Sequence, residues 1–130
     1  MRLEIVTGTE KADVTSVFES LVYAYKDENI MKFPEMNILH PNTLYKEMKK
    51  VVREHIENDK DLFILTYSDH VLNATRVEIK GHQFEGALCR QVNDDNEEHV
   101  ATISKNGELS YWENGVFDVW DNALIELLDI

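Results

Sequence analysis

Three residues that could carry out acid–base or nucleophilic chemistry, Ser68, Asp69 and His70, stand next to one another in the run TYSDHVLNATR at residues 66–76. Serine, histidine and aspartate form the set that many acyl-transfer enzymes use, but that chemistry depends on how the side chains meet in space, not on adjacency in the chain. The G-x-S-x-G turn that exposes a nucleophilic serine does not surround Ser68. A small enzyme acting through Asp69 and His70 is therefore our third functional hypothesis, and no second motif supports it.

Metal and thiol chemistry find less support in the sequence. The five histidines do not pair with one another, or with the single cysteine, at spacings typical of zinc ligands. Asp94, Asp95, Glu97 and Glu98 crowd one segment, but the glycine and distal glutamate of an EF-hand calcium loop are absent, which favours a solvated hairpin turn. Cys89 is expected to be a small buried apolar residue. The sequence thus predicts no metal, no cofactor and no catalytic residue.

Helix and strand patterns alternate along the first part of the chain. Apolar residues recur at helical spacing in three segments, each preceded by a residue suited to begin a helix. Short apolar runs between them predict strands, and the continuous run before the TYSDH segment predicts a buried, central, parallel strand. The expected elements are a strand at residues 3–6, a helix at 14–26 after Asp13, a strand at 29–33, a helix at 41–58 beginning with Pro41, a strand at 61–66, and a helix from Ser68 or Asp69 through Thr75.

The character of the sequence changes after residue 80. Asn, Asp and Gly residues suited to turns separate short segments that have the pattern of antiparallel strands. These segments are residues 87–92, 99–104 and 108–112, and an amphipathic helix is expected at 116–128. The predicted fold class is α/β, with α+β left open. One domain is expected, with helices covering a partial sheet over residues 14–80, then a small antiparallel section and a C-terminal helix over residues 81–130.

Charge limits the partners that this chain can have. It carries 25 acidic and 13 basic side chains among 130 residues, a formal net charge of -12. Because nucleic-acid affinity comes largely from Lys and Arg, direct DNA binding is not expected. The densest basic group, Lys46, Lys49, Lys50 and Arg53, is expected to form one solvated helix face. No apolar run approaches the ~20 residues of a membrane span, and one cysteine cannot form an internal disulfide, so we expect a cytoplasmic protein without membrane contact.

Three segments of this chain resemble one family of ATPases. PEMNILHP at residues 34–41, TYSDHVLNATR at 66–76 and GELSYWENGVFD at 107–118 are similar to E-P-E-x-x-L-H-P, T-H-S-D-H-x-x-N-x-x-R and G-x-x-x-x-W-P-x-G-F-F-D. Together they resemble the C-terminal half of an ABC-type ATPase of the overcoming-lysogenization-defect-like branch, including its C-terminal domain of unknown function. The resemblance covers most of the chain from Val14 onward and implies a partial P-loop-type sheet with covering helices.

The parts of that family that hydrolyse ATP are missing here. The phosphate-cradling pattern G-x-x-x-x-G-K-S/T does not occur, and GTEK at residues 8–11 lacks its spacing. Lys32 and Phe33 stand where the family has its magnesium-binding carboxylate and a polar neighbour, although Mg²⁺ requires oxygen ligands. Tyr67 replaces the histidine that contacts the γ-phosphate. Since phosphoryl transfer depends on these groups, the resemblance implies a pseudo-ATPase fragment that does not hydrolyse ATP.

Two non-catalytic hypotheses follow, and both involve a protein partner. In the first, the chain docks on a related full-length ATPase or on a second copy of itself, through the face that closes over nucleotide in the family. A phage or mobile-element genome would suit such a remnant. In the second, the acidic chain is a decoy that imitates DNA toward a nucleic-acid-binding protein, which requires carboxylates spaced along one face. The docking residues expected under the first hypothesis are Glu35, His40, Ser68, Asp69, His70, Asn73 and Arg76.

Overall fold

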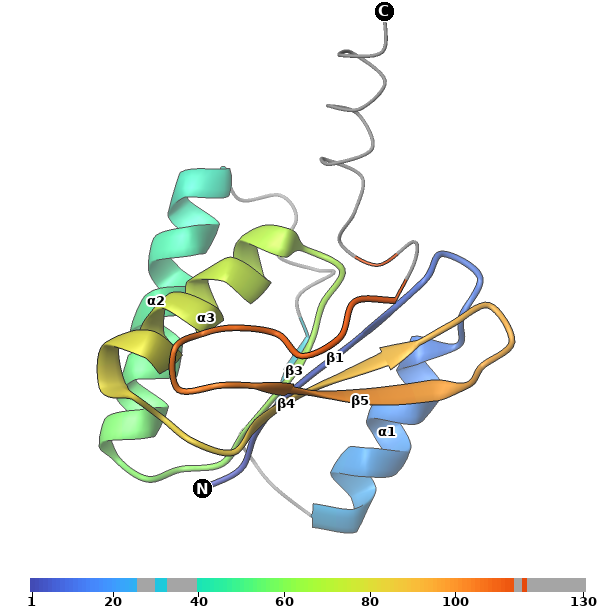
Figure 1. Cartoon of the computed structure of the whole chain (residues 1–130), viewed down its shortest axis with the longest axis horizontal. Coiled ribbons are helices and arrows are strands. Elements are labelled where there is room, and N and C mark those ends of the chain that lie inside the picture. The colour runs from blue at the N-terminus through green and yellow to red at the C-terminus, as the bar shows by residue number, and fades with distance from the viewer. Residues whose placement is uncertain (26–29, 33–39, 114–115, 117–130) are drawn as a thin grey trace, which may run out of the picture.

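The computed structural model of the protein describes residues 1–25, 30–32, 40–113 and 116. Within these residues, helices and strands alternate until a final hairpin (Figure 1). The elements are β1 (Leu3–Gly8), α1 (Val14–Tyr25), β2 (Ile30–Lys32), α2 (Pro41–Glu57), β3 (Leu62–Leu65), α3 (Asp69–His82), β4 (Ala87–Val92) and β5 (Glu98–Ile103).

The strands form one mixed sheet in the order β2-β3-β1-β4-β5. β3 pairs in parallel with β2 on one side and with β1 on the other. β4 continues the parallel part beside β1, and β5 runs antiparallel to β4. The predicted α/β class is therefore confirmed, and so is the central, parallel position expected for the strand at residues 61–66.

Helices cover both faces of the sheet, which explains why its central strands are apolar on both sides. Ile5 and Ile64 face α2 and α3, whereas Val6 and Phe63 pack in a second buried cluster with Phe18 of α1. In Figure 1, α2 and α3 lie side by side on one side of the sheet and α1 lies on the other. Successive residues of the run LFIL in β3 therefore contribute side chains to two hydrophobic clusters, one on each face of the sheet.

The helix starts follow the expected capping residues. Asp13 precedes α1 and accepts a hydrogen bond from the N–H of Ser16 at 3.3 Å. Pro41 is the first residue of α2, and Ser68 caps α3 through a bond from the N–H of Val71 to its hydroxyl oxygen. The Asp13 and Ser68 side chains each satisfy an amide that the first turn of a helix leaves without a partner, whereas Pro41 has no N–H that would need one.

α3 is longer than the sequence pattern predicts. Its apolar stripe was expected to reach Thr75, but the helix continues to His82 and ends where Gln83 takes a left-handed conformation with φ of 50°. The buried face of this continuation includes Glu78, a charged residue that is nevertheless 5% exposed. Its carboxylate receives a hydrogen bond from Arg53 of α2 at 2.8 Å, so a polar residue occupies the buried stripe.

The last third of the described chain joins the same sheet instead of forming a separate section. β4 and β5 are antiparallel to each other as predicted, yet β4 also pairs with β1. Residues 108–112, predicted as a further strand, contribute one isolated bridge between Leu109 and Ile103. The predicted helix at 116–128 lies outside the described residues, apart from Val116.

Not one of the described helices combines the length and the apolar character that crossing a bilayer requires.

Candidate functional site

The edge of the sheet at the carboxyl ends of the parallel strands is a candidate site. The chain leaves β1 toward α1 on one face of the sheet and leaves β3 toward α3 on the other (Figure 1). β1 and β3 are neighbours, so their outgoing connections diverge at one point. In open α/β sheets, ligands commonly bind at such a point, beyond the carboxyl ends of the strands.

The connection after β1 is tied down by the β4–β5 turn. The N–H of Thr9 donates to the carbonyl of Val92 at 3.0 Å, and the Thr9 hydroxyl donates to a carboxylate oxygen of Asp94 at 2.5 Å. Further along, the N–H of Asp13 donates to the side-chain oxygen of Asn96 at 2.8 Å. The polar groups of Thr9 and the N–H of Asp13, which could otherwise face a ligand at this edge, are thus hydrogen-bonded to the β4–β5 turn.

Carboxylates also give this edge the wrong charge for a phosphate. Asp13 caps α1 with its own carboxylate, so it occupies the amide that an anion would otherwise use. Burial, and next the negative charge of Asp13, raise the pKa of the Tyr67 hydroxyl. A triphosphate at the edge would meet Asp13 and Asp94 instead of a cradle of free amides.

The serine, aspartate and histidine of the TYSDH segment do not form a catalytic arrangement. Ser68 receives a hydrogen bond from the N–H of Val71 at 3.5 Å, and its own N–H donates to the Thr66 hydroxyl at 3.0 Å. His70 is exposed on the first turn of α3, and within the described chain no hydrogen bond joins it to Ser68 or Asp69. The geometry assigns Ser68 to capping the helix.

Arg76 and Asn73, two of the expected docking residues, are held in a local network. Nε of Arg76 donates to the carbonyl of Gly107 at 2.7 Å, and its Nη1 donates to the side-chain oxygen of Asn73 at 3.2 Å. The guanidinium also lies 5.7 Å from the centre of the Trp112 ring. Arg76 therefore anchors α3 to the segment after β5, which leaves it less free to bind a partner than the sequence suggests.

The two remaining docking residues precede or begin α2. His40 is exposed and accepts a hydrogen bond from the N–H of Asn42 at 3.2 Å through its Nδ1, so it caps the helix. Glu35 lies outside the described residues, as does Phe33. Because α2 and α3 both follow parallel strands, their first turns lie at the same end of the molecule (Figure 1). The structure thus brings His40, Ser68, Asp69 and His70 to one edge.

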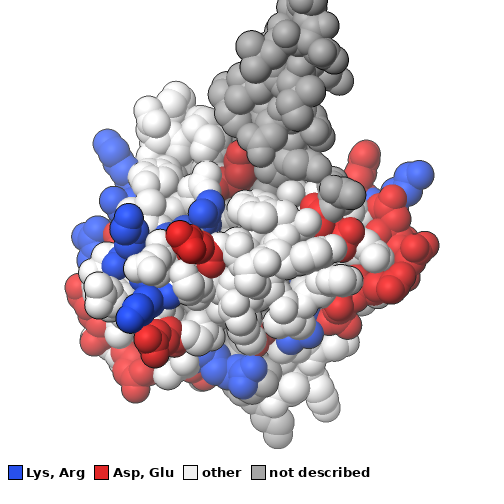
Figure 2. Space-filling model, in the orientation of Figure 1, with Lys and Arg blue, Asp and Glu red and all other residues white. Residues whose placement is uncertain are grey.

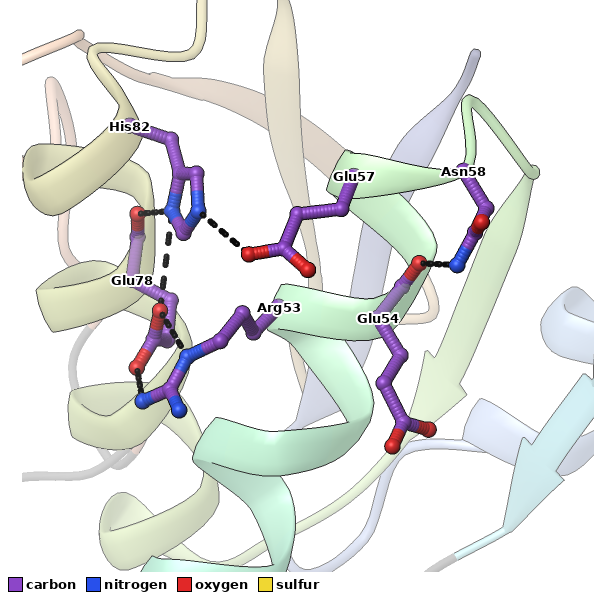
Figure 3. A network of polar contacts seen from close by, with 6 residues as sticks. All are labelled: Arg53, Glu54, Glu57, Asn58, Glu78 and His82. Atoms are coloured by element: carbon purple, nitrogen blue, oxygen red, sulfur yellow. Dashed lines mark hydrogen bonds and ion pairs between the residues drawn. The ribbon is translucent and has the colours of Figure 1, made fainter.

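The basic group on α2 is divided between contacts. Arg53 binds Glu78 of α3, and His82 lies 3.6 Å from both Glu78 and Glu57 (Figure 3). The hydrogen bonds that Arg53 donates to Glu78 are the main cause of the raised pKa of Arg53. Lys49 lies over the ring of Tyr45, at 5.6 Å. Arg53, Glu57, Glu78 and His82 join α2 to α3, whereas the contact of Lys49 with Tyr45 lies within α2. Figure 2 shows Lys and Arg gathered on this side of the molecule.

A metal site needs ligands that are close in space as well as suitably spaced in the sequence. In the part of the chain that the structure describes, no three His, Cys, Asp or Glu side chains come together as a metal-binding group. No family model, curated protein or solved structure matches this chain. The ATPase resemblance consequently remains a prediction, and the site has to be interpreted from its own geometry.

A row of charged side chains crosses the sheet, and the sequence pattern did not predict it. Glu4 is 1% exposed and receives a hydrogen bond from Arg2 at 2.9 Å. Arg90 lies 3.9 Å from the other oxygen of Glu4 and donates to Glu98 of β5 at 3.0 Å. The signal was present, because Glu4 and Arg90 are charged residues within short strands that are mostly apolar. Such interruptions indicate a buried ion pair when the strands prove to be neighbours.

Cys89 occupies the position expected of a small apolar residue. It lies on β4, is fully buried, and belongs to the cluster that packs under α2 and α3. Burial raises the pKa of its thiol to about 12, and a contact with the side chain of Gln91 offsets part of that effect. Because the thiolate is the reactive form, this cysteine is unsuited to act as a nucleophile near neutral pH.

The buried thiol should make stability fall in alkaline solution. A cysteine in an unfolded chain has a pKa of about 8.5, so above this pH the unfolded state loses a proton that the folded state retains. The contribution of Cys89 is complete below about pH 8.5 and is lost as the pH rises toward about 12. By pH 10, the wild type is expected to lose about 2 kcal/mol more than Cys89→Ala, relative to neutral pH. Urea unfolding of both proteins at the two pH values measures the difference, and equal losses would contradict the assignment.

Proposed function

We propose that this chain is a non-catalytic protein–protein interaction module, a degenerate relative of the ABC-type ATPases that it resembles. The proposal is carried mainly by one observation: the edge where an open α/β sheet would bind a ligand is closed by the chain's own side chains. Thr9 and Asp13 are joined to Asp94 and Asn96 across that edge. What remains exposed around it is a polar surface on the first turns of α2 and α3.

The topology supports the proposal in a second way. Two of the three segments that carry the resemblance follow β2 and β3 in the chain, and these strands are adjacent and parallel, so their carboxyl ends share one edge of the sheet. His40 and His70 are exposed there, and neighbouring Tyr67 is 49% exposed. A partner that approaches this edge would contact these three rings together. The proposed partner is a related full-length ATPase or a second copy of this chain.

The proposal predicts that ATP is neither bound tightly nor hydrolysed. Phosphoryl transfer requires positive charge and a metal around the phosphates, whereas this edge presents Asp13 and Asp94. Titration calorimetry with Mg·ATP is expected to show no micromolar binding, and phosphate release should stay at the level of a blank. Turnover above the blank, abolished by a substitution at this edge, would refute the proposal.

Capture experiments test the interaction itself. The chain is used as bait in an extract of its native host, beside the double variant Tyr67→Ala/His70→Ala, whose side chains make no hydrogen bond within the described residues. Tyr23→Ala, a tyrosine 82% exposed on α1 across the sheet, is the matched control. The double variant is expected to lose the partner and the control to retain it. If the double variant still captured the partner, or if the double variant and the Tyr23→Ala control lost it equally, this edge would be excluded as the docking surface.

Salt dependence separates this proposal from the decoy hypothesis. Association with a basic, nucleic-acid-binding partner should slow as salt rises, because steering between unlike charges is screened over ~8–10 Å. A related ATPase that meets the chain through loops and rings should associate at a rate nearly independent of salt. The on-rate of the captured partner at two salt concentrations therefore decides between them. The single buried cysteine fits a reducing compartment, so we place the protein in the cytoplasm as part of this proposal.

A further inference from the structure

The outer side of β5 has backbone groups directed away from the sheet. Near the end of the strand, the N–H of Thr102 donates to the Ser110 hydroxyl at 2.9 Å, and the carbonyl of Thr102 accepts from the N–H of Ser110 at 3.0 Å. These two bonds show that the polar groups of Thr102 point away from β4. They also show that this side of β5 can bind an extended segment.

The register shows that the same direction holds further along the strand. In an antiparallel pair, residues that bond to the partner alternate with residues that face outward. Val100 pairs with Arg90 and Glu98 with Val92, so both share the orientation of Thr102, which pairs with Leu88. Among the described residues, none bonds to the N–H or the carbonyl of Val100 or Glu98. Such an edge can accept an added strand.

A cavity lies next to this open edge. It has a volume of about 370 Å³, and α1 forms one wall while the β4–β5 hairpin forms the other. Glu98 lines it, and Val100 projects from the same face of β5 and is 48% exposed. The lining combines apolar and polar groups, from Ser16, Val17, Ser20, Leu21, Arg90 and Glu98. A long side chain of an added strand could enter this space.

The charge around the edge specifies what such a strand should carry. Asp94, Asp95, Glu97 and Glu98 are all exposed at or beside the β4–β5 turn, and Figure 2 shows acidic side chains gathered at this end of the molecule. Farther along the sheet, where β1 pairs with the start of β4, Oε2 of buried Glu4 has no hydrogen-bond partner among the described residues and lies 3.9 Å from Arg90. A segment with Lys or Arg would neutralise this field. A second β5 would instead bring the carboxylates of two copies together.

We propose that the outer edge of β5 at Glu98–Val100 binds an extended, basic segment of a partner protein by strand addition. The segment pairs with the backbone of these residues and places its lysines or arginines among the four carboxylates. The strand edge at Glu98–Val100 differs from the docking surface proposed on the first turns of α2 and α3, although Asp94 belongs to the turn that closes the carboxyl edge of the sheet. The peptide test does not depend on the proposed function.

Binding is tested with labelled ten-residue peptides. A peptide that alternates Lys and Val is compared with one that alternates Glu and Val, and with one in which proline replaces each Val. The Lys/Val peptide is expected to bind at least tenfold more tightly than either control by fluorescence anisotropy. The proline peptide keeps the charge but cannot pair as a strand. Equal binding of the two lysine peptides would mean charge attraction alone and would overturn strand addition.

Charge variants locate the site. Asp95→Lys/Glu97→Lys reverses two exposed side chains on the hairpin, and Glu47→Lys/Glu85→Lys makes the same change in net charge elsewhere on the surface. The hairpin variant is expected to weaken the Lys/Val peptide at least fivefold more than the control variant does. Equal weakening would show that binding follows net charge and not this edge, which would overturn the proposal.

Amide exchange reports the pairing directly. When the Lys/Val peptide binds, the amides of Glu98 and Val100 should exchange at least tenfold more slowly. The amides of His99 and Ala101 already face β4 and should change little. A Val100 amide that is protected in the free protein at every concentration would mean that the chain covers its own edge. Protection that appears as protein concentration rises would mean that a second copy does so. Either result would overturn the proposal.

Discussion

Replacing Phe63 by alanine is expected to lower the free energy of unfolding by about 3–5 kcal/mol. Phe63 is fully buried at the middle of β3, which has a neighbouring strand on each side. Its ring belongs to the cluster under α1 together with Val6, Phe18 and Leu65. Strands on both sides and a helix above leave the surrounding chain little freedom to collapse into the space. Leu65→Ala, at 3% exposure on the same face, should cost about 2–5 kcal/mol.

Chemical unfolding at neutral pH measures these losses, with Tyr23→Ala as the control. Tyr23 is also aromatic but 82% exposed, so its removal should change the free energy of unfolding by less than about 0.5 kcal/mol. A loss under about 1 kcal/mol for Phe63→Ala would mean that β3 is not a central strand. The position of the TYSDH segment at the edge of the sheet would then be wrong as well.

Two glycine-to-alanine substitutions are expected to act in opposite directions. A Cβ added to Gly8 would overlap Cγ2 of Val14 and lie 2.8 Å from the carbonyl oxygen of Val92. Because Val14 is buried and the other contact is backbone, relief requires the loop after β1 to move. Overpacking of this kind typically costs about 1–3 kcal/mol. Gly8→Ala should therefore destabilise the protein and loosen the bonds between this loop and the β4–β5 turn.

Gly81→Ala is the matched control for that substitution. Gly81 lies in the last turn of α3, and a Cβ there would have no atom within 4 Å. Alanine is favoured over glycine in a helix by up to about 1 kcal/mol, so this variant should be slightly more stable than wild type. The two variants are thus expected to differ by about 1–4 kcal/mol in chemical unfolding. Equal stabilities would mean that Gly8 does not pack closely against Val92.

Both substitutions bear on the proposed function, because the loop after β1 is what closes the edge of the sheet. If Gly8→Ala loosens this loop without unfolding the protein, the amides of Thr9 and Asp13 should exchange faster with solvent. The carboxylates of Asp13 and Asp94 would still oppose a phosphate, so Mg·ATP binding is not expected to appear. Binding that did appear would indicate that loop closure, more than charge, keeps nucleotide out.

Local patterns in the sequence determined the types and starts of the elements. Periodicity of apolar residues and capping side chains act within one or two turns, so Asp13, Pro41 and Ser68 marked the three helices. The run LFIL was apolar on both faces, which indicated a central strand before any neighbour was known. The net charge of -12 and the hairpin between β4 and β5 were also evident from residues close in the chain.

The tertiary structure alone decided which strands are neighbours and, through them, what the candidate residues do. No local pattern states that β1 lies between β3 and β4, because pairing partners are chosen by the burial of whole faces. That order brings Thr9 to Asp94 and Glu4 to Arg90. The contact between α3 and the segment after β5 likewise turns Arg76 from an expected docking residue into an anchor. A side chain's chemistry is visible in the sequence, whereas its availability depends on partners that are distant along the chain and adjacent only in the fold.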